Sequence, residues 1–231
     1  MATIWLTCRR PFDRHNLQVN TTIRDMVKRQ IVTWTGWSGS PHDVQWKLRI
    51  EQQAIGRRDS VVYFVGSFSS GVVRPRMRQD YQNANDSQRA ELREREIAWA
   101  NDSRSRPPTH LGATVAEAPA ASEVWIEACL FQIFGLGAHR PNWSPVLLDR
   151  TAKILAAVAL HELAHNKVEP VQQRSNPAWN LHNPAHGGGR IFTGVPSYNI
   201  QPSTTNMNLL RTHVAAPRQQ EVLAHPAFAA N

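Results

Sequence analysis

A run of apolar residues leads directly into two histidines, and this stretch constrains the fold more than any other part of the chain. Residues 154–160 are apolar on every face of a helix, which predicts a central, buried helix. His161 and His165 follow four residues apart, so both imidazole rings lie on one face of that helix and can reach one metal ion. Glu162 lies beside the first histidine. Ionisable groups in such an apolar setting are costly unless they are paired or bind a metal, so two ordinary surface histidines are the less favoured interpretation.

The residues from His161 to His165 form the pattern His-Glu-x-x-His, which is typical of the metal-binding helix of zinc hydrolases. In this pattern both histidines bind Zn²⁺, and Glu162 is the general base that activates a zinc-bound water. We therefore predict a zinc-dependent hydrolase, most simply a metalloendopeptidase that cleaves protein or peptide substrates. The alternative is a basic, nucleic-acid-associated binding protein whose zinc site is structural or non-catalytic.

A catalytic zinc site needs a third protein ligand, and two histidines follow the helix. His186 is preferred, because the glycines at 187–189 let the backbone approach the metal closely. His182 is the alternative. Glu169 lies about 12 Å along the helix axis from His161, so it cannot close the same site while the helix continues.

A hydrolase of this kind also needs a donor that stabilises the oxyanion of the tetrahedral intermediate, typically a tyrosine, histidine or arginine. Tyr198 is the candidate, with His213 and Arg190 behind it. A role for Tyr198 as a core aromatic residue is the competing interpretation.

The segment from Leu155 to Phe192 resembles the small zincins of the SprT-like and WLM type. In those proteins a His-Glu-x-x-His helix is followed by a third histidine and then an aromatic residue, as His186 is followed by Phe192 here. The resemblance implies a zincin-like domain, in which a small mixed sheet covers a buried metal-binding helix. It also implies three zinc ligands and one general base, namely His161, His165 and His186 with Glu162.

Hydrophobic patterning predicts a single α+β domain over residues 1–231. The expected strands are 2–8, 44–50, 60–65 and 122–131, and the expected helices are 22–33, 144–167 and 205–214. In zinc peptidases the strand before the metal helix often borders the cleft and pairs with extended substrate, so the resemblance assigns this role to 122–131. Trp34 and Trp37 are expected to cover the edge of the core rather than to stack on a ligand.

Two segments are expected to lie apart from the core. Residues 74–108 are rich in interleaved charges and predict a polar helical insertion, and residues 217–231 predict a loosely ordered tail.

The net charge of +8, from 26 Lys and Arg against 18 Asp and Glu, suits an anionic partner. The excess is spread along the chain, however, so nucleic acid is not the favoured partner. Cys8 and Cys129 lie too far apart for a Cys-x-x-Cys metal site and are expected to be free, packed thiols.

No apolar run reaches the roughly 18 residues that a membrane-spanning helix needs, and no secretory signal is visible at the start. We therefore expect a chain that is cytoplasmic as synthesised. Export by a specialised secretion or injection system, as for a delivered toxin or effector, is compatible with these features. The sequence gives no indication of the oligomeric state.

Overall fold

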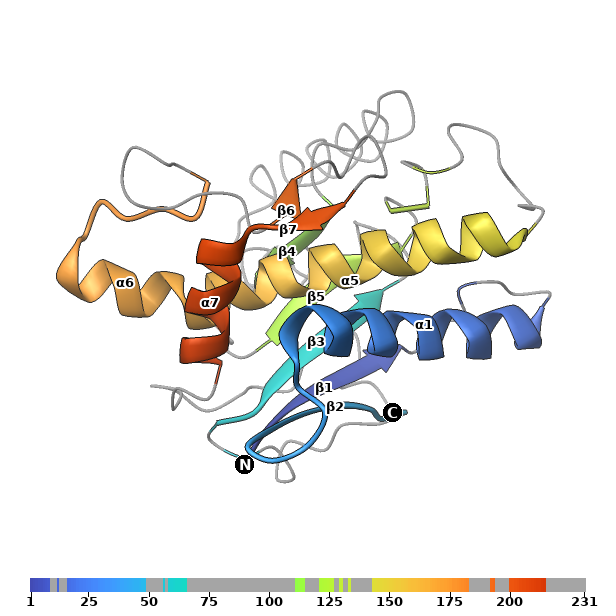
Figure 1. The fold of residues 1–231 in the computed structure, drawn as a ribbon, viewed down its shortest axis with the longest axis horizontal. Coiled ribbons are helices and arrows are strands. Elements are labelled where there is room, and N and C mark those ends of the chain that lie inside the picture. Colours follow the sequence, from blue (N-terminus) through green and yellow to red (C-terminus); the bar gives the residue numbers. More distant parts are fainter. Residues whose placement is uncertain are drawn as a thin grey trace, which may run out of the picture.

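The computed structural model describes residues 1–8, 12, 16–48, 56, 58–65, 111–114, 121–126, 129–130, 133, 143–182, 192–193 and 200–214. The insertion predicted at 74–108 and the tail predicted at 217–231 lie outside these residues. The described residues have the predicted α+β arrangement, in which two long helices lie side by side on one face of a sheet (Figure 1).

The main sheet has five strands in the order β2-β1-β3-β5-β4. Its strands are β1 (Ala2–Cys8), β2 (His42–Trp46), β3 (Ser60–Val65), β4 (Gly112–Thr114) and β5 (Ala121–Trp125). The pairs β1–β2, β1–β3 and β3–β5 are parallel, whereas β4 pairs antiparallel with β5. The sheet therefore has a parallel body and one reversed edge strand.

The strand register places the apolar residues of neighbouring strands on the same face. Leu6 is the partner of Val62, and Cys8 is the partner of Phe64. All four are buried in the hydrophobic core, because alternate residues of a strand point to the same side of the sheet. The pattern of 60–65 thus predicted a buried strand correctly, and Cys8 is buried in the core as expected.

Helix α1 (Leu17–Thr35) is longer at both ends than the predicted helix at 22–33. Asn16 caps its start by accepting a hydrogen bond from the Val19 amide, and Gly36 ends it in the left-handed conformation at φ 78°. Capping by single polar residues extends a helix beyond its apolar stripe, so apolar spacing alone underestimates the length. Trp34 and Trp37 are 9% and 4% exposed, which confirms that they cover the core.

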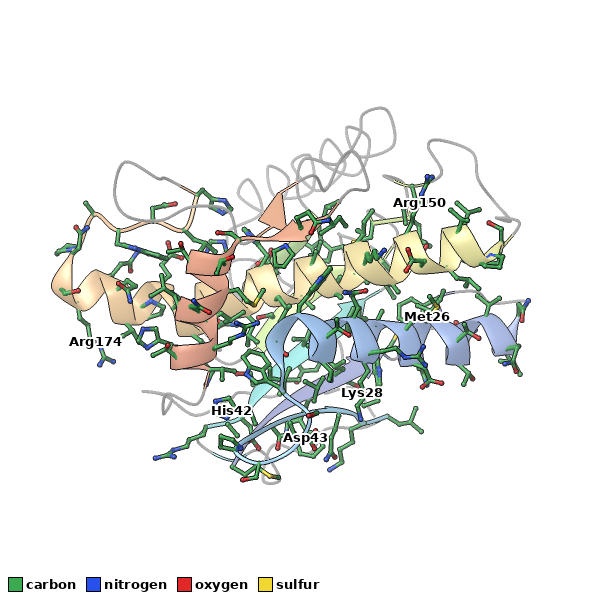
Figure 2. All side chains as sticks on the ribbon, in the orientation of Figure 1. Met26, Lys28, His42, Asp43, Arg150 and Arg174 are labelled. Carbon is green, nitrogen blue, oxygen red and sulfur yellow. The ribbon has the colours of Figure 1, made fainter. Side chains whose placement is uncertain are left out.

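Helix α5 (Pro145–Lys167) confirms the predicted central helix. Ser144 caps it by accepting a hydrogen bond from the Leu147 amide, and Pro145 occupies its first turn. The apolar residues 154–160 are all buried, because α5 packs against α1 on one side and against β5 and β4 on another. Met26 is partly buried and points from α1 toward α5 (Figure 2).

The C-terminal end of α5 is fastened to the sheet by two polar side chains. Asn166 donates a hydrogen bond of 2.6 Å to the Ser122 hydroxyl in β5. The Lys167 ammonium, 4% exposed, lies 3.5 Å from the carbonyl oxygen of Arg58 just before β3. These contacts fix the last turn of α5, which also carries His165.

A second helix, α6 (Glu169–Ser175), follows α5 almost without a break. α5 ends at Lys167, before Pro170, as predicted, but Pro170 lies in the first turn of a new helix that the sequence analysis did not predict. The first turn of a helix has no use for the amide hydrogen that proline lacks, so a proline can start a helix as well as end one. Arg174, near the end of α6, extends away from the body of the molecule (Figure 2).

Helix α7 (Thr204–His213) lies across the end of α1, close to the predicted helix at 205–214. Arg211 holds it there by donating hydrogen bonds of 3.1 and 2.6 Å to the carbonyl oxygens of Thr35 and Trp34. Before α7, a small two-stranded sheet is formed by β6 (Phe192–Thr193) and β7 (Gln201–Pro202). Within the described residues no helix is long and apolar enough to cross a membrane.

The strand predicted at 122–131 is shorter than expected. β5 ends at Trp125, and Ile126 and Cys129 beyond it are helical and buried. The segment alternates at first and becomes continuously apolar only at 128–131, and a short apolar run does not distinguish a strand from a buried helix. β5 also lies between β3 and β4, so β4 rather than β5 forms this edge of the sheet.

Candidate metal centre

His161 and His165 lie on one face of α5, one helical turn apart, as their spacing predicts. Both are partly buried. Their ring centroids are 4.9 Å apart, and Nε2 of His161 lies 3.3 Å from Nε2 of His165. The two rings therefore direct the same nitrogen atom toward one point.

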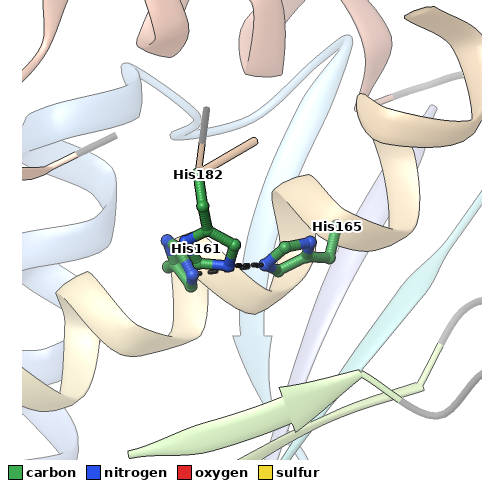
Figure 3. Close-up of side chains that lie close together, drawn as sticks. All are labelled: His161, His165 and His182. Carbon is green, nitrogen blue, oxygen red and sulfur yellow. Dashed lines mark hydrogen bonds between the residues drawn. The ribbon is translucent and has the colours of Figure 1, made fainter. Parts of the chain in front are cut away.

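A third histidine, His182, comes from the turn that follows α6. Trp179 and Leu181 in this turn are 4% and 1% exposed, so two apolar anchors hold the backbone on either side of Asn180. The Asn180 side chain accepts a hydrogen bond of 2.8 Å from the His182 amide. Nε2 of His182 then lies 3.0 Å from Nε2 of His165, and the three rings converge (Figure 3).

The spacing of these nitrogens fits one metal ion. With Zn–N bonds of about 2.0–2.1 Å, a tetrahedral zinc ion holds its nitrogen ligands about 3.3–3.4 Å apart. The separations of 3.3 and 3.0 Å from His165 to the other two rings are close to that value. The possible ligand atoms of His161, His165 and His182 all lie within 4.8 Å of one another. Imidazole nitrogens suit zinc, copper, iron and nickel, so the donor set fits a transition metal without selecting zinc.

Glu169 supports this cluster from behind His165. One of its carboxylate oxygens, Oε2, lies 2.6 Å from Nδ1 of His165, and both side chains are 17% exposed. A carboxylate in this position accepts a hydrogen bond from the Nδ1–H group, which keeps the proton on Nδ1 and leaves the lone pair of Nε2 available to a metal. Sequence spacing argued against Glu169 as a fellow ligand of His161 and did not predict this supporting position. The spacing of four residues from His165 is the signal that could have found it.

Glu162 lies beside the edge strand of the sheet and is 7% exposed. A methyl group added at Gly112 of β4 would come within 2.9 Å of Cγ of Glu162, so the backbone of β4 passes directly over this side chain. Cys129 is also near. Burial is the main cause that raises the pKa of the Cys129 thiol far above its usual range, and the negative charge of Glu162 adds to the effect. Cys129 therefore stays a neutral, packed thiol.

The structure thus brings together His161, His165 and the alternative third histidine, His182. The preferred third histidine, His186, lies outside the described residues, as do Tyr198 and Arg190. His213 is described, and its ring lies 3.2 Å from the Gln172 amide nitrogen between α7 and α6. Among the described residues, the metal-ligating cluster does not include His213.

The chain was also compared with known proteins. No model of a known protein family, no curated protein and no solved structure matches it.

Proposed function

We propose that the protein is a zinc-dependent hydrolase of zincin-like architecture that cleaves peptide bonds. The zinc ligands in this proposal are His161, His165 and His182, and Glu162 is the general base. The observation that carries the proposal is the convergence of three imidazole Nε2 atoms beside a helix that also bears Glu162. The resemblance to SprT-like and WLM-type zincins belongs to the same proposal.

A catalytic site is favoured over a structural one by the number of ligands. Structural zinc sites are closed by four protein ligands, whereas catalytic sites use three and leave the fourth position open. Within the part of the chain that the structure describes, the cluster contains three histidines. The carboxylate of Glu169 on His165 is also the type of support that metal-ligating histidines commonly have.

In the proposed reaction the protein's own groups bind the substrate and move the proton. Zinc, when bound, supplies Lewis acidity that polarises the scissile carbonyl and acidifies a water molecule. Glu162 accepts a proton from the attacking water and passes it to the departing amine. Its burial at the edge of the sheet keeps the carboxylate within a confined volume.

A peptide substrate is supported by the position of β4. Within the described residues β4 has a partner strand, β5, on one side only, and it is antiparallel to that partner. An extended peptide can add to such an edge through main-chain hydrogen bonds. Because the backbone at Gly112 passes over Glu162, a peptide added there would run beside the proposed general base.

The first test replaces Glu162 by Gln and measures both zinc content and peptide hydrolysis. The substitution removes the base and spares all three histidines, so zinc should stay at about one ion per chain while hydrolysis falls by at least about 100-fold. Peptide hydrolysis by the variant at the wild-type rate would contradict the assignment of Glu162. A wild-type protein that holds no stoichiometric zinc after reloading would contradict the proposed function itself.

The second arm of the test compares His182→Ala with His186→Ala as its matched control. Loss of His182 should lower zinc affinity and the melting temperature sharply, because metal binding also stabilises the fold. Loss of His186 should change both much less. If His186→Ala removes the metal and His182→Ala does not, the third ligand is His186. The nucleic-acid alternative predicts instead that Glu162→Gln has no effect on a salt-dependent affinity for DNA or RNA.

A further inference from the structure

We infer that Glu169 is a positioning residue that ties the second proposed metal ligand to the third. The inference rests on the proposed zinc site. Glu169 is the first residue of α6, four residues after His165 and directly before Pro170. Its Oε2 lies 2.6 Å from Nδ1 of His165, and its Oε1 accepts a hydrogen bond of 3.4 Å from the backbone amide of Leu181. Leu181 directly precedes His182. One carboxylate therefore contacts both a ligand on α5 and the turn that carries the other ligand.

This double contact matters because the backbone is held more firmly at one proposed ligand than at the other. His165 lies on a long helix whose last turn is fastened to the sheet through Asn166 and Lys167. His182 is exposed at the end of a turn. The carboxylate that orients His165 also accepts a hydrogen bond from the Leu181 amide. It therefore fixes the positions of the two imidazoles relative to each other.

A carboxylate is the side chain that meets both demands at once. Both partners of Glu169 are N–H groups when Nε2 of His165 is free for the metal, so both oxygens must accept. Glutamine has the same shape but only one accepting oxygen. With that oxygen on the Leu181 amide, the glutamine NH₂ faces Nδ1 of His165 and favours the tautomer with the proton on Nε2, the atom that should bind the metal. With the oxygen on His165, the NH₂ faces the Leu181 amide and the turn loses its tie.

The chain offers a matched control in Gln173, one turn further along α6. Its side-chain amide donates a hydrogen bond of 3.0 Å to the carbonyl oxygen of Trp179, in the same turn that carries His182. Gln173 is thus a second tie between α6 and this turn. Its replacement tests whether any loosening of the turn suffices, or whether the shared carboxylate is needed.

The experiment titrates zinc into the full-length, metal-free protein in competition with a chelator. Glu169→Gln and Glu169→Ala should each lower zinc affinity by about 10- to 100-fold, as the loss of such a supporting group typically does. Gln173→Ala should change it by less than about three-fold. In a His182→Ala background, the loss caused by Glu169→Ala should shrink, because the tie to the turn then holds no ligand.

A readout independent of zinc is the tautomer of His165 in the metal-free protein, measured from its ¹⁵N chemical shifts. The wild type should carry the proton on Nδ1, and Glu169→Gln should shift the population toward Nε2. The inference is overturned if both Glu169 variants bind zinc as the wild type does, or if Glu169→Ala has the same effect with and without His182. A wild-type His165 protonated on Nε2 also overturns it, even if the variants fail to fold. A wild type that binds no zinc overturns the proposed site as well, whereas the other outcomes leave that site standing.

Discussion

At Gly112 the edge strand β4 comes so close to α5 that a methyl group has no room. A Cβ atom built there would lie 2.5 Å from the carbonyl oxygen of Glu123 and 2.9 Å from side-chain atoms of Glu162 and Val158. The carbonyl belongs to the backbone of β5 and cannot turn away. β4 must therefore shift against β5 if a side chain is added, and the contacts with Glu162 and Val158 of α5 must adjust as well.

We predict that Gly112→Ala destabilises the fold by about 1–3 kcal/mol, the usual cost of overfilling a packed site. It should also lower peptide hydrolysis more than zinc affinity, because the displaced side chain belongs to the proposed base and not to a ligand. Denaturant unfolding and zinc titration of the same preparation measure both effects. A variant as stable and as active as the wild type would show that β4 does not support Glu162.

The residue pattern predicted part of the candidate site and left part of it open. His161, Glu162 and His165 follow from helical spacing, which depends only on backbone geometry. The choice between His182 and His186 could not be made in the same way. The position of His182 beside the other two histidines depends on the burial of Trp179 and Leu181, and therefore on which surfaces meet in three dimensions.

At the scale of elements, the contact between α6 and α7 is expected to respond to pH. Nε2 of His213 faces the side-chain amide nitrogen of Gln172 at 3.2 Å, and burial lowers the pKa of His213. The folded protein thus favours the neutral ring, and an N–H donor opposite Nε2 is consistent with that form.

We predict that the lowered pKa of His213 makes the free energy of unfolding decrease as the pH falls. Below the ordinary histidine pKa of about 6.5, the unfolded chain takes up a proton more readily than the folded chain, so the free energy of unfolding decreases through the window down to the lowered folded pKa. His213→Gln should show a shallower decrease than the wild type between neutral and mildly acidic pH. The other histidines are the same in both proteins, so the difference between the two curves isolates His213. Parallel curves would contradict the prediction.

Element boundaries show where sequence patterns were reliable. β1 and β3 were predicted closely because they are rich in β-branched and aromatic residues, and α5 because it is long and begins at a clear signal, Ser144-Pro145. β4 has only three residues and gave no periodic signal. The pairing of β4 with β5, which decides the edge of the sheet, depends on contacts that no local pattern encodes.

For the whole molecule, zinc should act as a stabilising ligand. At a free zinc concentration about 100 times the dissociation constant, binding adds about 2.7 kcal/mol to the stability of the fold. For a chain of this size that corresponds to a rise of roughly 5–11 °C in the melting temperature. Thermal melting with zinc and with excess chelator measures the shift, and His182→Ala should reduce it strongly. Equal melting temperatures in the two conditions would contradict a site formed only in the folded state.

The proposed donors are also close together along the chain. Everything from His161 to His182 belongs to one helix, a short second helix and a turn. Only a short loop must close to bring the donors together, so their meeting adds little to the entropic cost of folding. The sheet does not gather the three imidazoles from distant parts of the chain. It supports the helix that already carries two of them, so a substitution in the sheet would disturb the site by shifting α5 rather than by separating the donors.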